Sequence, residues 1–275
     1  MNLPPDAVDL STAVLITTFI AATGVLITSL EDLVDLRLFR AEGLLNWDVM
    51  RLQGTWSARG WSGRVSNILF NYRGFKIFLS MRLVAATTLF LFAKNHAVFL
   101  LSCLIILLSL VALSIRAVYG LDGAHQMFIV IFGALFLGGI AGENSIAQIF
   151  SVWFIALQAG MSYFISGVNK LFSSVWRSGD ALIGIFGTRS YGHSATYSLI
   201  STRPTLARVL SWTVILFECG FCLIFAVHLH FAFWILLIGL VFHISTAISM
   251  GLNGFFFAFV ATYPCIAYCV TVLHA

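Results

Sequence analysis

Three charged side chains interrupt long apolar runs of this sequence, and each is a candidate for chemistry. Lys170 ends the run SYFISGVNKLF, Glu218 lies in the middle of TVILFECGFCLIF, and Arg82 lies in FLSMRLVAATTLF. A charge in apolar surroundings costs free energy, so a charged residue kept there is a functional hypothesis by default. A purely structural role is the alternative for each of them.

Lys170 and Glu218 have the chemistry for proton transfer. A lysine acts as a base only when its surroundings remove its charge, which burial favours. The alternative for Lys170 is a cation at a helix end, where it would complement the helix dipole. Glu218 is either a proton-relay carboxylate or a structural one that joins two helices by hydrogen bonds. Arg82 lies about one turn from the end of its run, so we expect its long side chain to reach the aqueous interface.

Two histidines lie where a polar side chain could serve a buried site. His243 occurs in GLVFHISTAISMG, and hydroxyl residues follow it at Ser245, Thr246 and Ser249. This polar stripe predicts a cavity beside His243, and the alternative is a histidine that only hydrogen-bonds a neighbouring helix. His125 follows Asp122 at a spacing of three, which places both residues on one face at the start of a helix.

The spacings typical of common catalytic and metal sites are missing. The sequence has no phosphate-binding loop, no nucleophile elbow, no H-E-x-x-H and no dinucleotide fingerprint. Cys219 and Cys222 form a C-x-x-C, which in an apolar run is better explained by two small residues on a helix than by redox chemistry. The seven histidines are scattered along the chain, so no metal site is predicted.

The elements that must position these residues are membrane-spanning helices. Of the 275 residues, 60% are hydrophobic and 9% are charged, and the mean hydropathy is +0.99. An average soluble domain is about a quarter charged, so a soluble class is excluded and the expected solvent is a lipid bilayer. The net charge of +4 does not indicate a nucleic-acid partner, because Lys and Arg in membrane proteins mark the cytoplasmic side.

We predict an all-α, polytopic transmembrane helical bundle with eight spans, or seven if one segment is too short. A span needs about 20 mostly apolar residues. The predicted segments are 10–30, 77–93, 97–115, 124–140, 146–168, 209–228, 231–250 and 255–273. The acidic start MNLPPDAVDL favours retention of the first segment as a helix over its removal as a signal peptide.

Two polar segments lie between the predicted spans. Residues 31–76 mix Trp, Asp and Arg with apolar positions, which predicts interfacial helices on the cytoplasmic side. Residues 172–208 form a loop long enough to cover a cavity or re-enter the bilayer. With 31–76 inside, twelve Lys or Arg residues face the cytoplasm and only Lys94 faces outward, so both termini are expected outside. No linker or repeat divides the chain, which predicts a single transmembrane domain over 1–275.

Two motifs resemble the horizontally transferred transmembrane (HTTM) family, which includes the membrane domain of vitamin K-dependent gamma-carboxylase. The first is YFISGVNKL at 163–171, followed by Trp176 and Gly179. The second falls on Phe242, His243, Gly251, Phe255, Ala261 and Pro264. The helix around Glu218 resembles the family's helix between these motifs. The likeness covers the C-terminal half by motif and the N-terminal half by hydropathy.

This resemblance implies an enzyme with a lipid-soluble cofactor, reduced vitamin K or another quinol. In the family, the motif lysine deprotonates the quinol, and oxygen converts the resulting anion into a strong base. That base abstracts a proton from glutamate before CO2 adds. The catalytic residues implied here are Lys170, His125 and His243, and those that would contact the cofactor are Glu218, Trp176 and Tyr163.

The sequence also departs from the family. Asn169 stands where the family has a second lysine, and the carboxylase's large soluble region is not within these 275 residues. Short bacterial relatives are associated with peptide or toxin maturation, which implies the bacterial inner membrane and a secreted peptide substrate. The charge rule places the Lys170 end inside, whereas carboxylase chemistry faces the lumen, so the side on which Lys170 lies stays open.

Two other classes compete with the enzyme. One is a non-enzymatic membrane subunit that packs against the partners of a larger complex, with its polar residues serving only helix association. The other is a carrier, which no inverted repeat in the sequence supports.

Overall fold

The computed structural model describes residues 8–43, 45–53, 60–116 and 122–275, and within them it contains no strand. Eight helical segments are long and apolar enough to cross a membrane. They are α1 (Leu10–Val34), α5 (Tyr72–Phe92), α6 (His96–Arg116), α7 (Gly123–Ile140), α8 (Ile146–Phe172), α12 (Pro204–Gly220) with the 3-10 turn η3 (Phe221–Ala226), α13 (Leu229–Met250), and α14 (Asn253–Val260) with α15 (Tyr263–Leu273). The predicted all-α polytopic class with eight spans is confirmed.

Several helices extend beyond the apolar runs that predicted them. α5 begins at Tyr72 because the side chain of Asn71 caps it, accepting a hydrogen bond from the backbone N of Gly74 at 2.8 Å. α12 begins at Pro204, whose missing N–H costs nothing in a first turn. The last span is interrupted between α14 and α15, where Pro264 cannot continue the hydrogen-bond ladder. Capping residues and prolines therefore set these ends.

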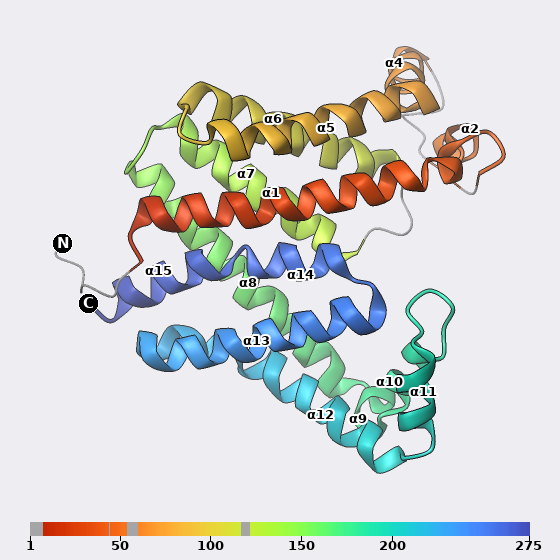
Figure 1. Ribbon diagram of the computed structural model, residues 1–275, viewed down its shortest axis with the longest axis vertical. Coiled ribbons are helices and arrows are strands. Elements are labelled where there is room, and N and C mark those ends of the chain that lie inside the picture. The colour runs from red at the N-terminus through yellow and green to blue at the C-terminus, as the bar shows by residue number, and fades with distance from the viewer. Residues whose placement is uncertain (1–7, 44, 54–59, 117–121) are drawn as a thin grey trace. The chain divides into compact units, whose positions relative to one another are not determined.

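The chain divides into two compact units. We call residues 1–14 and 152–275 the Lys170 unit, and residues 15–151 the Arg82 unit. In the Arg82 unit, α5 packs along α6 and α6 along α7, as Figure 1 shows. In the Lys170 unit, α13 packs against α14 and α15. Both boundaries fall inside helices, α1 and α8, so the single domain expected from the absence of a linker stays a prediction.

A buried arginine binds the predicted interfacial segment to α6. The segment's described helices are η1 (Leu36–Phe39), α2 (Trp47–Met50), η2 (Arg51–Gln53) and α4 (Gly60–Phe70). Arg116 donates from Nε to the carbonyl of Phe70 at 2.9 Å, from Nη1 to Leu45 at 2.9 Å and from Nη2 to Phe39 at 3.3 Å. Its guanidinium also lies 4.7 and 4.6 Å from the ring centres of Phe39 and Phe75. One cation thus satisfies three carbonyls that apolar surroundings would leave unpaired.

The segment predicted as a long loop, 172–208, is largely helical and packs on α12. Its helices are α9 (Ser174–Ser178), α10 (Asp180–Phe186) and α11 (Ser194–Ser201), which gather beside α12 in Figure 1. Gly179 joins α9 to α10 with φ 93°, and a Cβ there would lie only 2.6 Å from the backbone N of Arg208. Ser211 on α12 donates to the carbonyl of Trp176. These contacts fix Trp176 close to the end of α8.

Candidate functional site

Lys170 and Glu218 form an ion pair between α8 and α12. The Nζ of Lys170, in the last turn of α8, lies 2.6 Å from Oε2 of Glu218. Nζ also donates to Oγ of Ser166, one turn earlier, at 2.5 Å. The side chain of Lys170 is 17% exposed and that of Glu218 is 7% exposed, so the pair is largely buried. Removing either partner would leave the other charge buried and unpaired, which is strongly unfavourable.

Close contact between the two helices makes this pairing feasible. A Cβ added to Gly167 would lie 2.5 Å from the backbone N of Cys219 and 2.9 Å from the carbonyl carbon of Glu218. Two turns before Gly167 on α8, the carbonyl of Gly160 accepts a hydrogen bond from Sγ of Cys222 at 3.2 Å. Small residues let membrane helices approach closely, and both members of the C-x-x-C serve this contact as free thiols.

Trp176 lies beside the lysine of this pair. Its ring centre is 5.0 Å from Nζ of Lys170, within the range of a cation–π interaction. The hydroxyl of Ser173 caps α9 by accepting from the backbone N of Trp176 at 3.4 Å. The ammonium therefore meets a carboxylate, a hydroxyl and an indole. Trp176, which the resemblance associated with the cofactor, is in contact with the candidate base.

A second cluster of polar side chains includes Tyr163, which lies two turns before Lys170 on α8 and on the same face of that helix. The hydroxyl of Tyr163 is hydrogen-bonded to Nε2 of His243 and lies 3.3 Å from the hydroxyl of Tyr263. His243 is 0% exposed, and none of the described residues provides a hydrogen-bond partner for its Nδ1. The rings that surround the imidazole, with centres 5.1 to 5.3 Å away, are those of Phe242, Phe255 and Phe259. A buried unpaired nitrogen costs about 1–3 kcal/mol, so a hydrogen-bonding ligand atom here would be stabilising.

The hydroxyls expected to form a polar stripe beside His243 bond to the backbone of their own helix. Ser245 donates to Val241 at 2.5 Å, Thr246 to the carbonyl of His243 at 2.9 Å, and Ser249 to Ser245 at 2.5 Å. Such bonds to the preceding turn are common for Ser and Thr in apolar helices. The stripe therefore does not extend a polar surface to the imidazole, whose hydroxyl partner comes from α8.

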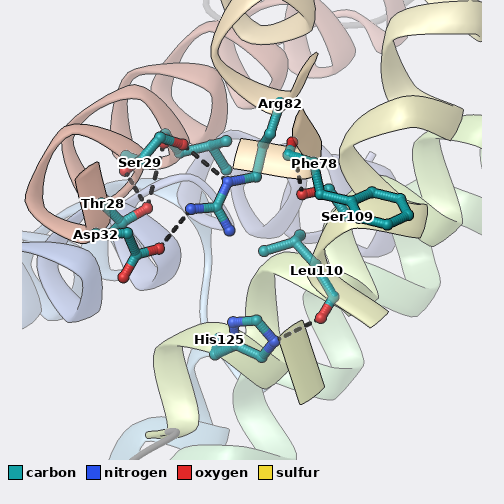
Figure 2. Close-up of polar contacts among 10 residues, drawn as sticks. Thr28, Ser29, Asp32, Phe78, Arg82, Ser109, Leu110 and His125 are labelled. Atoms are coloured by element: carbon teal, nitrogen blue, oxygen red, sulfur yellow. Dashed lines mark hydrogen bonds and ion pairs between the residues drawn. The ribbon is translucent and has the colours of Figure 1, made fainter. Parts of the chain in front are cut away.

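The side chain of Arg82 is enclosed by its partners, and its position relative to the aqueous interface stays a prediction, because Asp32 belongs to the segment predicted to be interfacial. Its side chain is 1% exposed, and its Nη2 lies 2.6 Å from Oδ2 of Asp32. Its Nε donates to Oγ of Ser29 at 2.8 Å (Figure 2). The reason is that the last turns of α1 supply a carboxylate and a hydroxyl beside α5. A guanidinium with a local counter-charge has no need to extend into water.

His125 belongs to the same Arg82 unit. Its Nε2 lies 2.9 Å from the carbonyl of Leu110 (Figure 2). It also lies 2.9 Å from Oγ of Ser114. Asp122 caps α7 by accepting from the backbone N of His125 at 3.1 Å, rather than pairing with the imidazole. Because Lys170 lies in the other unit, the predicted cooperation of His125 with Lys170 stays a prediction.

The structure thus brings some of the predicted residues together within one unit. The contacting groups are Lys170 with Glu218 and Trp176, and Tyr163 with His243. Sequence reasoning missed Ser166 and Tyr263. The spacing of four between Ser166 and Lys170 was a usable signal, since such residues face each other on a helix. Tyr263 gave no local signal, because its partner lies 100 residues away in the chain.

The site belongs to an integral, multi-pass membrane protein, as the eight long apolar helices establish. Within the described part of the chain, no three His, Cys, Asp or Glu side chains are arranged to hold a metal ion. Comparisons with protein-family models, with curated proteins and with solved structures give no match.

Proposed function

We propose that this protein is an HTTM-type enzyme of the bacterial inner membrane that uses a quinol, such as reduced vitamin K, to modify a secreted peptide. The observation that carries the proposal is the ion pair of Lys170 and Glu218, 2.6 Å long and beside Trp176. The resemblance of YFISGVNKL to the carboxylase motif supports Lys170 as the base. The carboxylate of Glu218 would accept the proton that Lys170 must lose before it can act as a base.

The pair gives a route to a neutral lysine without a net change of charge. A proton that moves from Nζ of Lys170 to Oε2 of Glu218 converts two ions into an amine and a carboxylic acid. This transfer costs less in apolar surroundings than in water, because both ions have already lost most of their hydration. The amine can then take a proton from a substrate hydroxyl. The O–H bond breaks, an N–H bond forms at Nζ, and the ammonium stays close to the negative charge left behind.

The residues on α8 and α13 fit an aromatic cofactor with hydrogen-bonding oxygens. A quinol supplies an ionisable hydroxyl and, once deprotonated, a ring that reacts with oxygen. None of the described residues provides a hydrogen-bond partner for Nδ1 of His243, and a ring oxygen admitted between the enclosing phenylalanine rings would provide one. The Tyr163 hydroxyl offers a second hydrogen bond next to it. These two residues, with Trp176 and Glu218, are the ones that would hold the cofactor.

Replacement of Lys170 by arginine separates a base from a structural cation. Arginine can keep an ion pair with Glu218, but it cannot give up its proton. We expect Lys170→Arg and Glu218→Gln to abolish quinol-dependent incorporation of labelled CO2 into a glutamyl peptide, by at least 100-fold. The matched control is Lys94→Arg, an exposed lysine outside the site, which should leave the rate unchanged.

The same purified protein gives a second readout. Lipid extracts of the wild type should contain a quinone, and extracts of a His243→Leu variant should contain less. If the Lys170→Arg variant keeps full activity, Lys170 is not the base. If the wild type neither retains a quinone nor consumes reduced quinol under oxygen, the proposal fails.

One observation favours the second candidate, a non-enzymatic subunit of a larger membrane complex. The ion pair lies next to a close contact between α8 and α12, at Gly167 and Cys219, where it would also strengthen helix association. A subunit should co-purify with a protein partner in fixed ratio and should tolerate Lys170→Arg. An enzyme should do neither.

A further inference from the structure

The Arg82 unit contains a second polar centre within its membrane helices, and its chemistry is independent of the function proposed above. Arg82 on α5 and His125 on α7 are 1% and 9% exposed. Figure 2 shows the guanidinium and the imidazole directed toward the same space, with Asp32 and Ser29 of α1 on one side and Leu110 of α6 on the other. Ionisable groups placed this way among membrane helices indicate a functional site.

The protonation of His125 follows from its partners. The carbonyl oxygen of Leu110, 2.9 Å from Nε2, can only accept a hydrogen bond. Nε2 therefore carries the proton, and the neutral ring has a lone pair on Nδ1. None of the described residues forms a hydrogen bond with that nitrogen. Nδ1 can therefore accept a hydrogen bond from a bound molecule.

Arg82 supplies the complementary donor. Its Nε and Nη2 donate to Ser29 and Asp32 (Figure 2), while none of the described residues accepts a hydrogen bond from Nη1. The described chain encloses some nitrogens that have no hydrogen-bond partner. Nη1 of Arg82 and Nδ1 of His125 are not among these enclosed atoms. Each atom therefore keeps a hydrogen-bonding capacity that the described residues do not use.

We propose that this centre binds the carboxyl group of a carboxylic acid. Asp32 already offsets the charge of Arg82, so an incoming anion would add an unbalanced charge, whereas a protonated acid adds none. Its carbonyl oxygen accepts from Nη1 and its hydroxyl donates to Nδ1. The proton can then pass to Nδ1: the acid's O–H bond breaks, an N–H bond forms, and a carboxylate lies between two cations. An ester has no hydrogen to donate, and the N–H of an amide is too weakly acidic to pass its proton to Nδ1, so neither forms the charge-assisted pair.

The acid has two sources, a long-chain fatty acid dissolved in the bilayer or a short acid from water. We would add oleic acid or propionate, each ¹³C-labelled at the carboxyl carbon, to the purified full-length protein and record the carboxyl resonance. The expected result is a protein-bound resonance with one of the two probes, which also names the source. Unlabelled oleamide and methyl oleate should not displace bound oleate.

His125→Gln is the sharpest variant, because the glutamine amide can still donate to Leu110 and accept a hydrogen bond, but it cannot take up the acid's proton as Nδ1 can. We expect it to weaken binding at least tenfold, and Arg82→Lys, which keeps the charge next to Asp32, to do the same. The control Lys76→Gln, exposed on the same helix as Arg82, should bind as the wild type does. The proposal is overturned if neither probe gives a bound resonance, as for a site that holds only water. Oleamide that competes as well as oleate, or both variants binding unchanged, overturns it too. The amide and ester competition uses the wild type, so it decides the matter even if a variant does not fold.

Discussion

Replacing Gly167 by alanine tests whether backbone contact between α8 and α12 sets the geometry of the ion pair. The added Cβ would lie 2.5 Å from the backbone N of Cys219. Ordinary contacts of a Cβ begin at 3.4 Å, so the helices must separate by about 0.9 Å. A different side-chain rotamer cannot relieve this contact, because the nearest atom belongs to the backbone.

The expected cost has two parts. Overpacking of a close contact costs about 1–3 kcal/mol. A separation of about 0.9 Å would also stretch the 2.6 Å contact between Lys170 and Glu218 toward the limit of a hydrogen bond. We therefore expect Gly167→Ala to lower the free energy of unfolding in detergent by about 2–4 kcal/mol. The measurement is unfolding of the purified protein, followed by circular dichroism during titration with a denaturing detergent.

Gly220→Ala is the matched control on the other helix. Gly220 lies two residues after Glu218, and nothing lies within 4 Å of the position its Cβ would take. Alanine there should leave the stability unchanged or raise it by up to about 1 kcal/mol. Adding Cys219→Ala to Gly167→Ala should not restore stability, because the backbone nitrogen remains. A full rescue by Cys219→Ala, or a Gly167→Ala protein as stable as the wild type, would refute the close backbone contact.

Three further predictions follow from other parts of the chain. Arg116→Met should lower the free energy of unfolding by at least about 2 kcal/mol, measured as above, because two buried carbonyls and one partly buried carbonyl lose their donor. Hydrogen bonds, the largest from Ser11, lower the pKa of Asp9 from 3.8 to about 2. That stabilisation should be complete above about pH 4, decline as the pH falls toward 2, and be absent from Asp9→Asn in thermal unfolding across this range. For orientation, a cysteine placed at Lys94 should react with an impermeant maleimide in intact cells, and one placed at Arg203 should not.

Hydropathy predicted the eight spans because crossing a bilayer demands a local property, about 20 consecutive apolar residues. It could not predict helix ends, which depend on single polar residues such as Asn71 at the start of α5. The short helices after α8 were also beyond reach. They are stabilised by packing on α12, as the hydrogen bond from Ser211 to Trp176 illustrates, and not by length or periodicity.

The site was only partly predictable, because the sequence marks unusual residues but not their partners. Lys170, Glu218 and Trp176 were all selected, yet the pairing of the first two spans 48 residues. It depends on a glycine that allows two helices to approach. The ion pair of Arg82 was missed for the same reason: its carboxylate partner, Asp32, lies 50 residues earlier on another helix. When the partner of a charged side chain is unknown, the side chain is expected to contact water. When a counter-charge lies beside it, the side chain can stay buried.

The partner also changes what each residue can do. Considered alone, Lys170 was either a base or a helix-end cation, and Glu218 was either a proton-relay carboxylate or a structural one. In contact at 2.6 Å, the two form one unit that is neutral overall and can exchange a proton internally. Both earlier alternatives then describe states of the same pair, since the ionic form binds the helices and the neutral form supplies an amine. It follows that the loss of Glu218 alone should impair Lys170 in both roles, by removing its counter-charge and the acceptor of its proton.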